Sequence, residues 1–184
     1  QRAVILVGVL AISALSGLSM ATSLTILYCF SSEPLHLKAA LIAWLTVVGY
    51  LGTLWYFQRR QAVLPAANLY ALAATFSTIV PCMITGGISA SPYLTLVLIV
   101  PIFMALIAGR AYGFSWAVVT IFCVGLLLIA ESSGTQFPQV LPDTWQAYFK
   151  FVTWLTTLGL LVLGILVYEK NFEELNERIA VERS

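Results

Sequence analysis

The chain has 184 residues, of which 60% are hydrophobic and only 9% are charged, and its mean hydropathy is +0.95. Soluble domains are about half apolar and about a quarter charged, so this composition excludes a soluble globular domain and indicates an integral membrane protein. The formal net charge of +1 excludes an electrostatic nucleic-acid partner. One His and three Cys cannot build a multi-His or four-cysteine metal centre, and we expect neither a metal nor a cofactor.

Six apolar stretches, each about as long as a bilayer crossing requires, follow one another along the chain with short polar or Gly/Pro-containing separators. They are Val4–Phe30, Lys38–Phe57, Ala66–Ile84, Tyr93–Ala108, Phe114–Ala130 and Trp145–Tyr168. We therefore predict an all-α membrane protein, a bundle of six transmembrane helices that occupies residues 1–168. Kinks are expected near Pro81 and Pro101, because proline removes a backbone donor from a helix. The separators, Thr85–Pro92 among them, are too short to fold by themselves.

Lys and Arg residues concentrate on one side of the predicted topology. That side carries Arg2, Arg59, Arg60, Arg110, Lys170, Arg178 and Arg183, whereas Lys38 and Lys150 fall on the other side. Short loops rich in Lys and Arg stay in the cytoplasm. We expect a multi-pass protein in the lipid bilayer with both termini cytoplasmic.

The last span continues as a helical pattern past the predicted membrane boundary. Its apolar positions recur at spacings of 3, 4, 3 and 4 residues, at Ile165, Tyr168, Phe172, Leu175 and Ile179. This a/d pattern is typical of a coiled coil, and it predicts a homodimer that pairs through the sixth helix and transmits a signal along it. Residues 169–184 are expected to begin this cytoplasmic signalling coiled coil. A single amphipathic helix on the membrane surface is the alternative.

The segment Thr85–Val119, TGGISASPYLTLVLIVPIFMALIAGRAYGFSWAVV, contains a Thr-Gly-Gly turn, a Pro inside the fourth span and a Gly-Arg-x-x-Gly turn into the fifth. With these marks it resembles the central part of the six-helix membrane input domains of bacterial sensor histidine kinases and diguanylate cyclases. The overall layout is similar to the membrane anchors of bacterial class III adenylate cyclases and of quorum-sensing kinases that detect hydrophobic hydroxyketones.

The resemblance implies a receptor domain for signal transduction, such as a two-component system, in the bacterial inner (plasma) membrane. The chain begins at Gln1 and ends at Ser184 within a charged helical pattern. We therefore expect an excised part of a longer chain, with a kinase or nucleotide cyclase output domain beyond Ser184. The part given carries no catalytic residue of such a domain and is expected not to be an enzyme itself.

Candidate ligand contacts come from aromatic and hydroxyl side chains in or near the outer halves of the spans, because the central thirds hold no ionisable residue. Aromatic walls with a few hydroxyls are the usual lining of a site for a small, mostly apolar ligand. The candidate ligand-binding residues are Trp44, Tyr50, Phe76, Thr78, Cys82, Cys123, Lys150 and Trp154.

Each candidate has a structural alternative. Hydroxyls of the first, third and sixth spans can simply join helices, and Cys123 can be a small buried apolar residue. Lys150 can pair with Glu131 or Asp143 or extend its charge to the membrane surface. A disulfide between Cys29 and Cys82 also stays open.

These observations favour a sensory input domain that detects a small apolar ligand or a membrane property and transmits it through the sixth helix to a cytoplasmic output domain. A passive membrane anchor and dimerisation module is the first alternative. A small-molecule transporter is the second, although it would need a polar path or a charge at the midplane.

Overall fold

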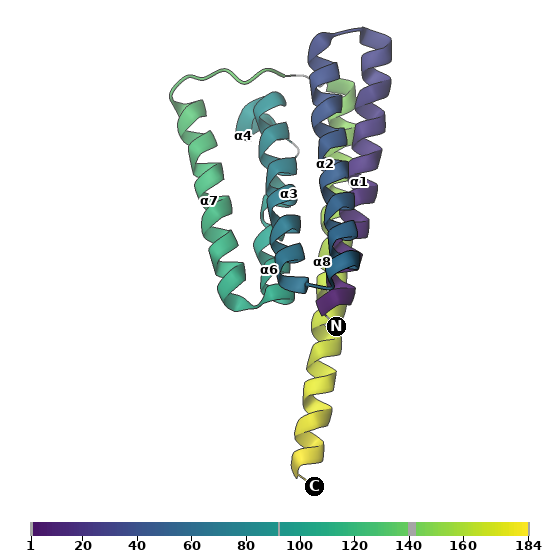
Figure 1. Ribbon diagram of the computed structural model, residues 1–184. Helices are drawn as coiled ribbons and strands as arrows, with labels where there is room; N and C mark the ends of the chain where they lie inside the picture. The colour runs from purple at the N-terminus through teal and green to yellow at the C-terminus, as the bar shows by residue number, and fades with distance from the viewer. Residues whose placement is uncertain (1, 92, 140–142, 184) are drawn as a thin grey trace.

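The computed structural model describes residues 2–91, 93–139 and 143–183, and in this part of the chain every regular element is a helix (Figure 1). The long helices are α1 (Arg2–Ser31), α2 (Pro34–Arg60), α3 (Val63–Ile84), α6 (Ile99–Ala108), α7 (Arg110–Ser132) and α8 (Asp143–Arg183), with the short helices α4 (Gly87–Ala90) and α5 (Leu94–Val97) between α3 and α6. The all-α prediction is therefore confirmed for the described residues.

Five helices among the described residues are long and apolar enough to cross a membrane: α1, α2, α3, α7 and the part of α8 from Trp145 to Leu166. A shorter apolar segment, Leu94–Ala108, contributes α5 and α6. The outer surface of the bundle is itself apolar, with Leu15, Phe122 and Leu158 each more than half exposed. An apolar exterior on helices that satisfy their own backbone groups is what a bilayer requires, so the fold indicates a membrane-embedded protein.

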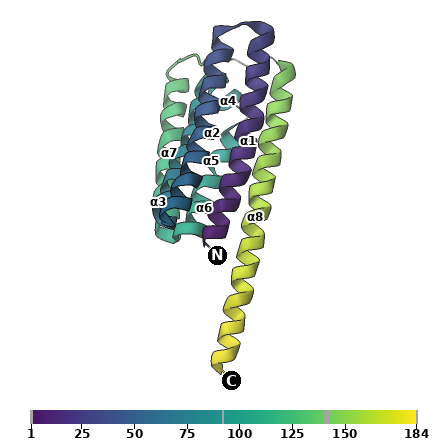
Figure 2. The same cartoon turned by 45° about the vertical axis from the view of Figure 1, so that its right-hand side comes forward.

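The helices run up and down, so that the turns gather at two ends of the bundle (Figures 1 and 2). We call the end with Arg2, Gln61 and Gly109 the tail end, because α8 continues beyond it. We call the opposite end, with Ser32 and the turn of residues 85–91, the cap end. The basic turns predicted to share one side of the membrane do lie together at the tail end.

The predicted fourth span is interrupted. It forms α5 and α6, with Leu98 between them. Pro101 has no N–H to donate to the carbonyl of Val97, and its ring crowds that carbonyl, so the helix breaks directly after Val97. The kink expected near Pro101 thus takes the form of a break three residues earlier, whereas α3 continues without interruption through Pro81 to Ile84.

The loop after α7 folds across the turn after α3 and closes the cap end. Thr85 and Gln139 form an isolated antiparallel bridge, and the Gly86 N–H donates to the Pro138 carbonyl at 3.1 Å. The Ile88 N–H donates to the Glu131 carboxylate at 2.9 Å. Residues 85–91 were expected to be too short to fold by themselves, and these contacts from a distant loop accompany the short helix α4.

Gly87 explains why the two cap segments approach so closely. Its φ of +79° lies in the left-handed region, where glycine carries no steric penalty. A Cβ at this position would lie 2.8 Å from the Phe137 ring and 2.9 Å from a Glu131 carboxylate oxygen. Phe137 in turn packs on the buried cluster below, so the cap is anchored to the core.

Two buried clusters fill the bundle. The first joins α1, α3, α6 and α8 and includes the fully buried side chains of Leu6, Tyr70, Phe103 and Met104. Small alanines of α3, such as Ala71, allow the helices to approach closely there. The second lies toward the cap end and its members include Met20, Leu24, Leu27, Ala39, Ala40, Cys82, Tyr93, Leu127 and Phe149. Between these clusters the packing is incomplete.

Candidate functional site

A cavity of about 80 Å³ lies inside the bundle, between its middle and the cap end. Helices α1, α2, α3, α6 and α8 supply its walls, together with Tyr93 and Leu96 beside and within α5. An apolar cavity of about 150 Å³ is enough to hold benzene, so this cavity has room for a molecule of only a few heavy atoms.

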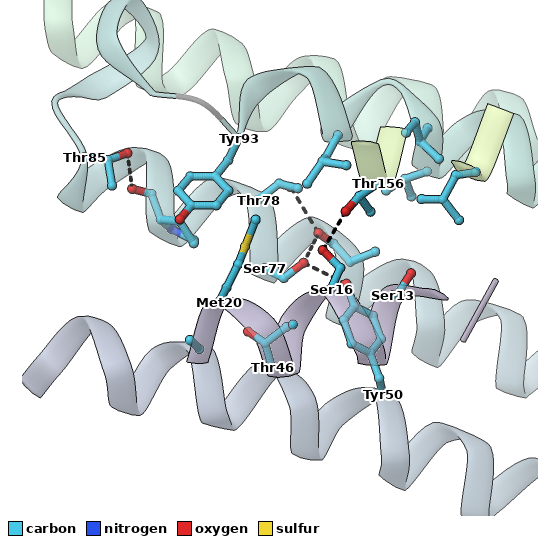
Figure 3. Close-up of a pocket in the computed structure, with 18 of the residues that line it drawn as sticks. Ser13, Ser16, Met20, Thr46, Tyr50, Ser77, Thr78, Thr85, Tyr93 and Thr156 are labelled. Atoms are coloured by element: carbon cyan, nitrogen blue, oxygen red, sulfur yellow. Dashed lines mark hydrogen bonds between the residues drawn. The ribbon is translucent and has the colours of Figure 1, made fainter. Parts of the chain in front are cut away.

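Two hydroxyl pairs form the polar part of the cavity nearest the middle of the bundle (Figure 3). The Tyr50 hydroxyl lies 2.8 Å from the Ser77 hydroxyl, which donates to the Ala74 carbonyl at 2.9 Å. Because Ser77 has one proton, Tyr50 must be the donor in the pair. These contacts join α2 to α3.

The second pair joins α1 to α8. The Ser16 and Thr156 hydroxyls lie 2.8 Å apart, and Thr156 donates its proton to the Val152 carbonyl at 2.8 Å. Ser16 is therefore the donor to Thr156. Helix α8 is thus hydrogen-bonded to α1 directly at the cavity wall.

Tyr93 lines the cavity at the cap end. Figure 3 shows its ring reaching inward on the side of Thr85, away from the two hydroxyl pairs. The Tyr93 ring packs edge-on against Phe149 of α8, with ring centroids 6.4 Å apart. The Ser91 hydroxyl accepts the Tyr93 backbone N–H at 3.2 Å and lies 3.0 Å from the Thr85 hydroxyl, so the turn holds the backbone from which the ring projects.

The lining is uncharged. Its described side chains are aliphatic, aromatic or hydroxyl-bearing, and they include neither a carboxylate nor a basic group. Among the described residues, no three His, Cys, Asp or Glu side chains come together in a way that could hold a metal ion. Such a site has no acid, base or electrophile for catalysis and is suited to binding an uncharged molecule.

Two of the predicted ligand residues, Tyr50 and Thr78, line the cavity. Both are buried, and the Thr78 hydroxyl donates within α3 to the Ala74 and Thr75 carbonyls. Cys82 is fully buried in the cap-end cluster, next to the cavity but not on its wall.

The other predicted ligand residues lie on other faces of their helices. Phe76 and Trp154 are 39% and 69% exposed on the outer surface, and Trp44, also on the surface, donates its indole N–H to the Thr25 hydroxyl at 3.1 Å. Cys123 is half-buried on α7, a helix that does not line the cavity, and Lys150 is exposed on α8. A ligand role for these five residues stays a prediction from the sequence.

The remaining sequence expectations concern side chains away from the cavity. Lys150 forms no ion pair with a described residue, and the three cysteines, Cys29 and Cys82 included, are free thiols. Ile165 of the predicted signalling seam is 58% exposed. The backbone of α8 is helical to Arg183, while the side chains of Tyr168, Phe172, Leu175 and Ile179 lie outside the described part of the structure.

Sequence reasoning missed several wall residues that share one face of a helix. They are Met20 and Leu24 on α1, Ala39, Ala43 and Thr46 on α2, Tyr70 on α3, and Tyr93 before α5. The available signal was spacing: Ala39, Ala43, Thr46 and Tyr50 recur every three or four residues, which places them on one side of a helix. Choosing aromatic residues by their depth alone selected outward-facing side chains as well.

Comparisons with protein-family models, with curated proteins and with solved structures found no match to this chain. The class that the fold and the cavity define is therefore a helical, membrane-embedded protein with a small uncharged internal cavity.

Proposed function

We propose that this chain is a membrane sensory input domain that detects a small apolar ligand, or a property of the membrane, and transmits the event through α8 to a cytoplasmic signalling domain. One observation carries the proposal. Helix α8 lines the cavity through Thr156 and Leu160, and the same helix continues unbroken to Arg183, past the tail end of the bundle (Figure 2).

A ligand in the cavity would touch α8 directly at Thr156, which is hydrogen-bonded to Ser16, and at Leu160. Toward the cap end it would act on α8 only through Tyr93, whose ring packs edge-on against Phe149. A ligand that binds one arrangement of these contacts better than another shifts the population of α8 positions. A rigid helix carries such a shift along its whole length.

The packing of α8 supports this role. Its outward side chains, among them Leu155, Leu158 and Leu166, are more than half exposed, and only one face of the helix meets the bundle. A helix held on one face has fewer contacts to rearrange than a helix that is surrounded.

The proposal also covers the orientation of the bundle in the membrane, the number of spans, the oligomeric state and the output domain. Arg59, Arg60 and Arg110 lie at the tail end, which favours a cytoplasmic location for this end and for both termini. We propose six spans, with α5 and α6 together crossing as the fourth. A parallel homodimer would pair through the α8 extension as a coiled coil, in the inner membrane of a bacterium, and the output domain would be a kinase or nucleotide cyclase.

A transporter fits the cavity less well, because the hydroxyl groups of the wall stop near the middle of the bundle. Toward the tail end the described interior is filled by tightly packed apolar residues, including Leu6, Phe103, Met104 and Ile107. A polar solute would find no hydrogen-bonding path across this part of the bundle.

The experiment compares two Thr→Leu substitutions in a cysteine-free background. Thr78→Leu fills the cavity, whereas Thr22→Leu changes an exposed residue of α1 that does not line it. Spin labels at Gln61 and Glu177 report the distance between the tail end and the α8 extension in spin-diluted nanodiscs. We expect Thr78→Leu to shift the distance distribution and Thr22→Leu to reproduce the unsubstituted protein. Identical distributions in all three would favour the passive anchor.

A further inference from the structure

The protons of the cavity hydroxyls are almost all committed to partners within the protein. Those of Ser77, Thr78 and Thr156 go to backbone carbonyls of their own helices, and Thr46 and Thr85 do the same. The Tyr50 hydroxyl donates to Ser77, and the Ser16 hydroxyl donates to Thr156. The Tyr70 phenol has the Ser13 hydroxyl as its neighbour.

Tyr93 is the exception. Its side chain is only 4% exposed and lines the cavity, yet its hydroxyl has no hydrogen-bond partner among the described residues. The buried hydroxyl oxygens without a partner among the described residues are those of Thr75 and Thr153, which do not line the cavity. The Tyr93 hydroxyl is not one of these sealed atoms, so it faces cavity space in which a bound molecule can pair with it. The Tyr93 ring is held in the wall by its edge-on contact with Phe149, and the Tyr93 backbone N–H is held by the Ser91 hydroxyl.

We infer that Tyr93 is the recognition residue of the cavity and that its hydroxyl donates a hydrogen bond to the carbonyl-type oxygen of a small uncharged ligand. This inference rests on the proposed function and gives its ligand a chemical class. The Tyr93 hydroxyl has a proton to donate, and an oxygen acceptor on the ligand would complete this hydrogen bond. The apolar surroundings, which include Met20, Leu24 and Leu96, exclude a carboxylate or an ammonium group and suit a short hydrocarbon body.

The position of Tyr93 connects recognition to the output helix. The same ring that presents the hydroxyl packs on Phe149, which is fully buried on α8. A ligand oxygen that holds the phenol in one orientation therefore also holds the surface on which Phe149 rests.

The test uses two probes of matched shape, 2-butanone and 2-methyl-1-butene, which differ by an oxygen acceptor in place of a CH2 group. Dissociation constants are measured by ligand-observed NMR with the full chain in lipid nanodiscs, and Thr78→Leu nanodiscs correct for partition into lipid. The variant is Tyr93→Phe, and the control is Tyr112→Phe, which removes a hydroxyl from a half-exposed ring on α7.

We expect Tyr93→Phe to weaken 2-butanone binding about 3- to 10-fold, as for the loss of one neutral hydrogen bond, and to leave 2-methyl-1-butene unchanged. Tyr112→Phe should change neither. Equal 2-butanone affinity in the Tyr93→Phe variant would overturn the inference while leaving the cavity as a ligand site. Loss of both probes in that variant would also overturn it, because Tyr93 would then only maintain the fold.

A second measurement needs no variant. The infrared carbonyl stretch of 2-butanone bound to the unsubstituted protein should lie at lower frequency than that of 2-butanone in lipid, because a hydrogen bond weakens the C=O bond. An unshifted band would contradict donation by Tyr93. If neither probe binds the unsubstituted protein at all, the inference fails together with the ligand branch of the proposed function, and detection of a membrane property or a passive anchor stands in its place.

Discussion

At the scale of single residues, Gly113 allows α6 and α7 to approach closely. A Cβ at this position would lie 2.5 Å from the Ala105 Cβ and 2.9 Å from its Cα, so the backbones of α6 and α7 meet without room for a methyl group. Helices in membranes associate through such small-residue contacts, because lipid supplies no hydrophobic force between them. This contact attaches α7, which contributes nothing to the cavity wall, to α6, which does.

Gly113→Ala should therefore destabilise the protein by about 1–3 kcal/mol, the usual cost of overpacking, since a backbone atom must shift to make room. Gly125→Ala is the matched control on the same helix, because a Cβ there meets nothing within 4 Å. Reversible unfolding in mixed micelles measures both. Equal stability of the two variants would contradict the close approach of α6 and α7.

At the scale of elements, α8 differs from the other helices because it belongs both to the bundle and to the extension. Its membrane part shows side chains packed on α1 and α6, and its backbone stays helical far past the tail end. The apolar spacing from Ile165 to Ile179 predicts a partner for the extension. A row of apolar side chains on a single helix would be exposed to water, and a partner helix buries it.

Single cysteines at Phe172 or Leu175, on the predicted seam, should form disulfides between subunits rapidly under mild oxidation. Cysteines at Glu173 or Glu177, off the seam, should do so at least several-fold more slowly, because the coiled coil holds them apart. The measurement is the fraction of dimer on a non-reducing gel over time, in a background without the native cysteines. Similar rates at all four positions would rule out the coiled coil.

At the scale of the whole molecule, the distribution of charge gives the bundle a direction. The turns with Arg59, Arg60 and Arg110 share the tail end with the N-terminus, whereas Glu33 and Glu131 lie at the cap end. Positively charged turns are retained on the cytoplasmic side during insertion, so the cap end should face outward.

Two exposed glutamines in turns, Gln139 at the cap end and Gln61 at the tail end, allow a matched test. A cysteine that replaces Gln139 should react with a membrane-impermeant thiol reagent in intact cells, and one that replaces Gln61 should react only after the cells are opened. The native cysteines are first replaced, because Cys29 is exposed near the cap end. The opposite labelling pattern would reverse the proposed topology.

Much of the fold follows from local properties of the sequence. The length and apolar character of each stretch predict the long helices, and Pro101 predicts a local disturbance of the fourth stretch, because both depend only on residues close in the chain. The clustering of the basic turns at one end follows from the alternation of helices. Tyr50 and Thr78 were candidates because of their depth in the spans and their side-chain type, and not because of the helix face that they occupy.

The cavity itself depends on tertiary structure. Trp44, Phe76 and Trp154 have the composition of a ligand wall, but the rotation of α2, α3 and α8 in the bundle turns them outward. That rotation is decided by contacts between helices far apart in sequence, such as Ser16 with Thr156.

The cap end likewise has features that the sequence predicts and features that depend on the tertiary structure. From the sequence alone, Thr85–Pro92 is a short turn, and nothing local predicts that Glu131 and Phe137 contact it at Gly87 and Ile88. The sequence by itself determined that the chain forms apolar helices with a basic end, because hydrophobicity, proline and charge act over a few residues. Only the tertiary structure decided which faces meet and leave a cavity lined in part by Tyr93, because packing and hydrogen bonding act between residues that the fold alone brings together.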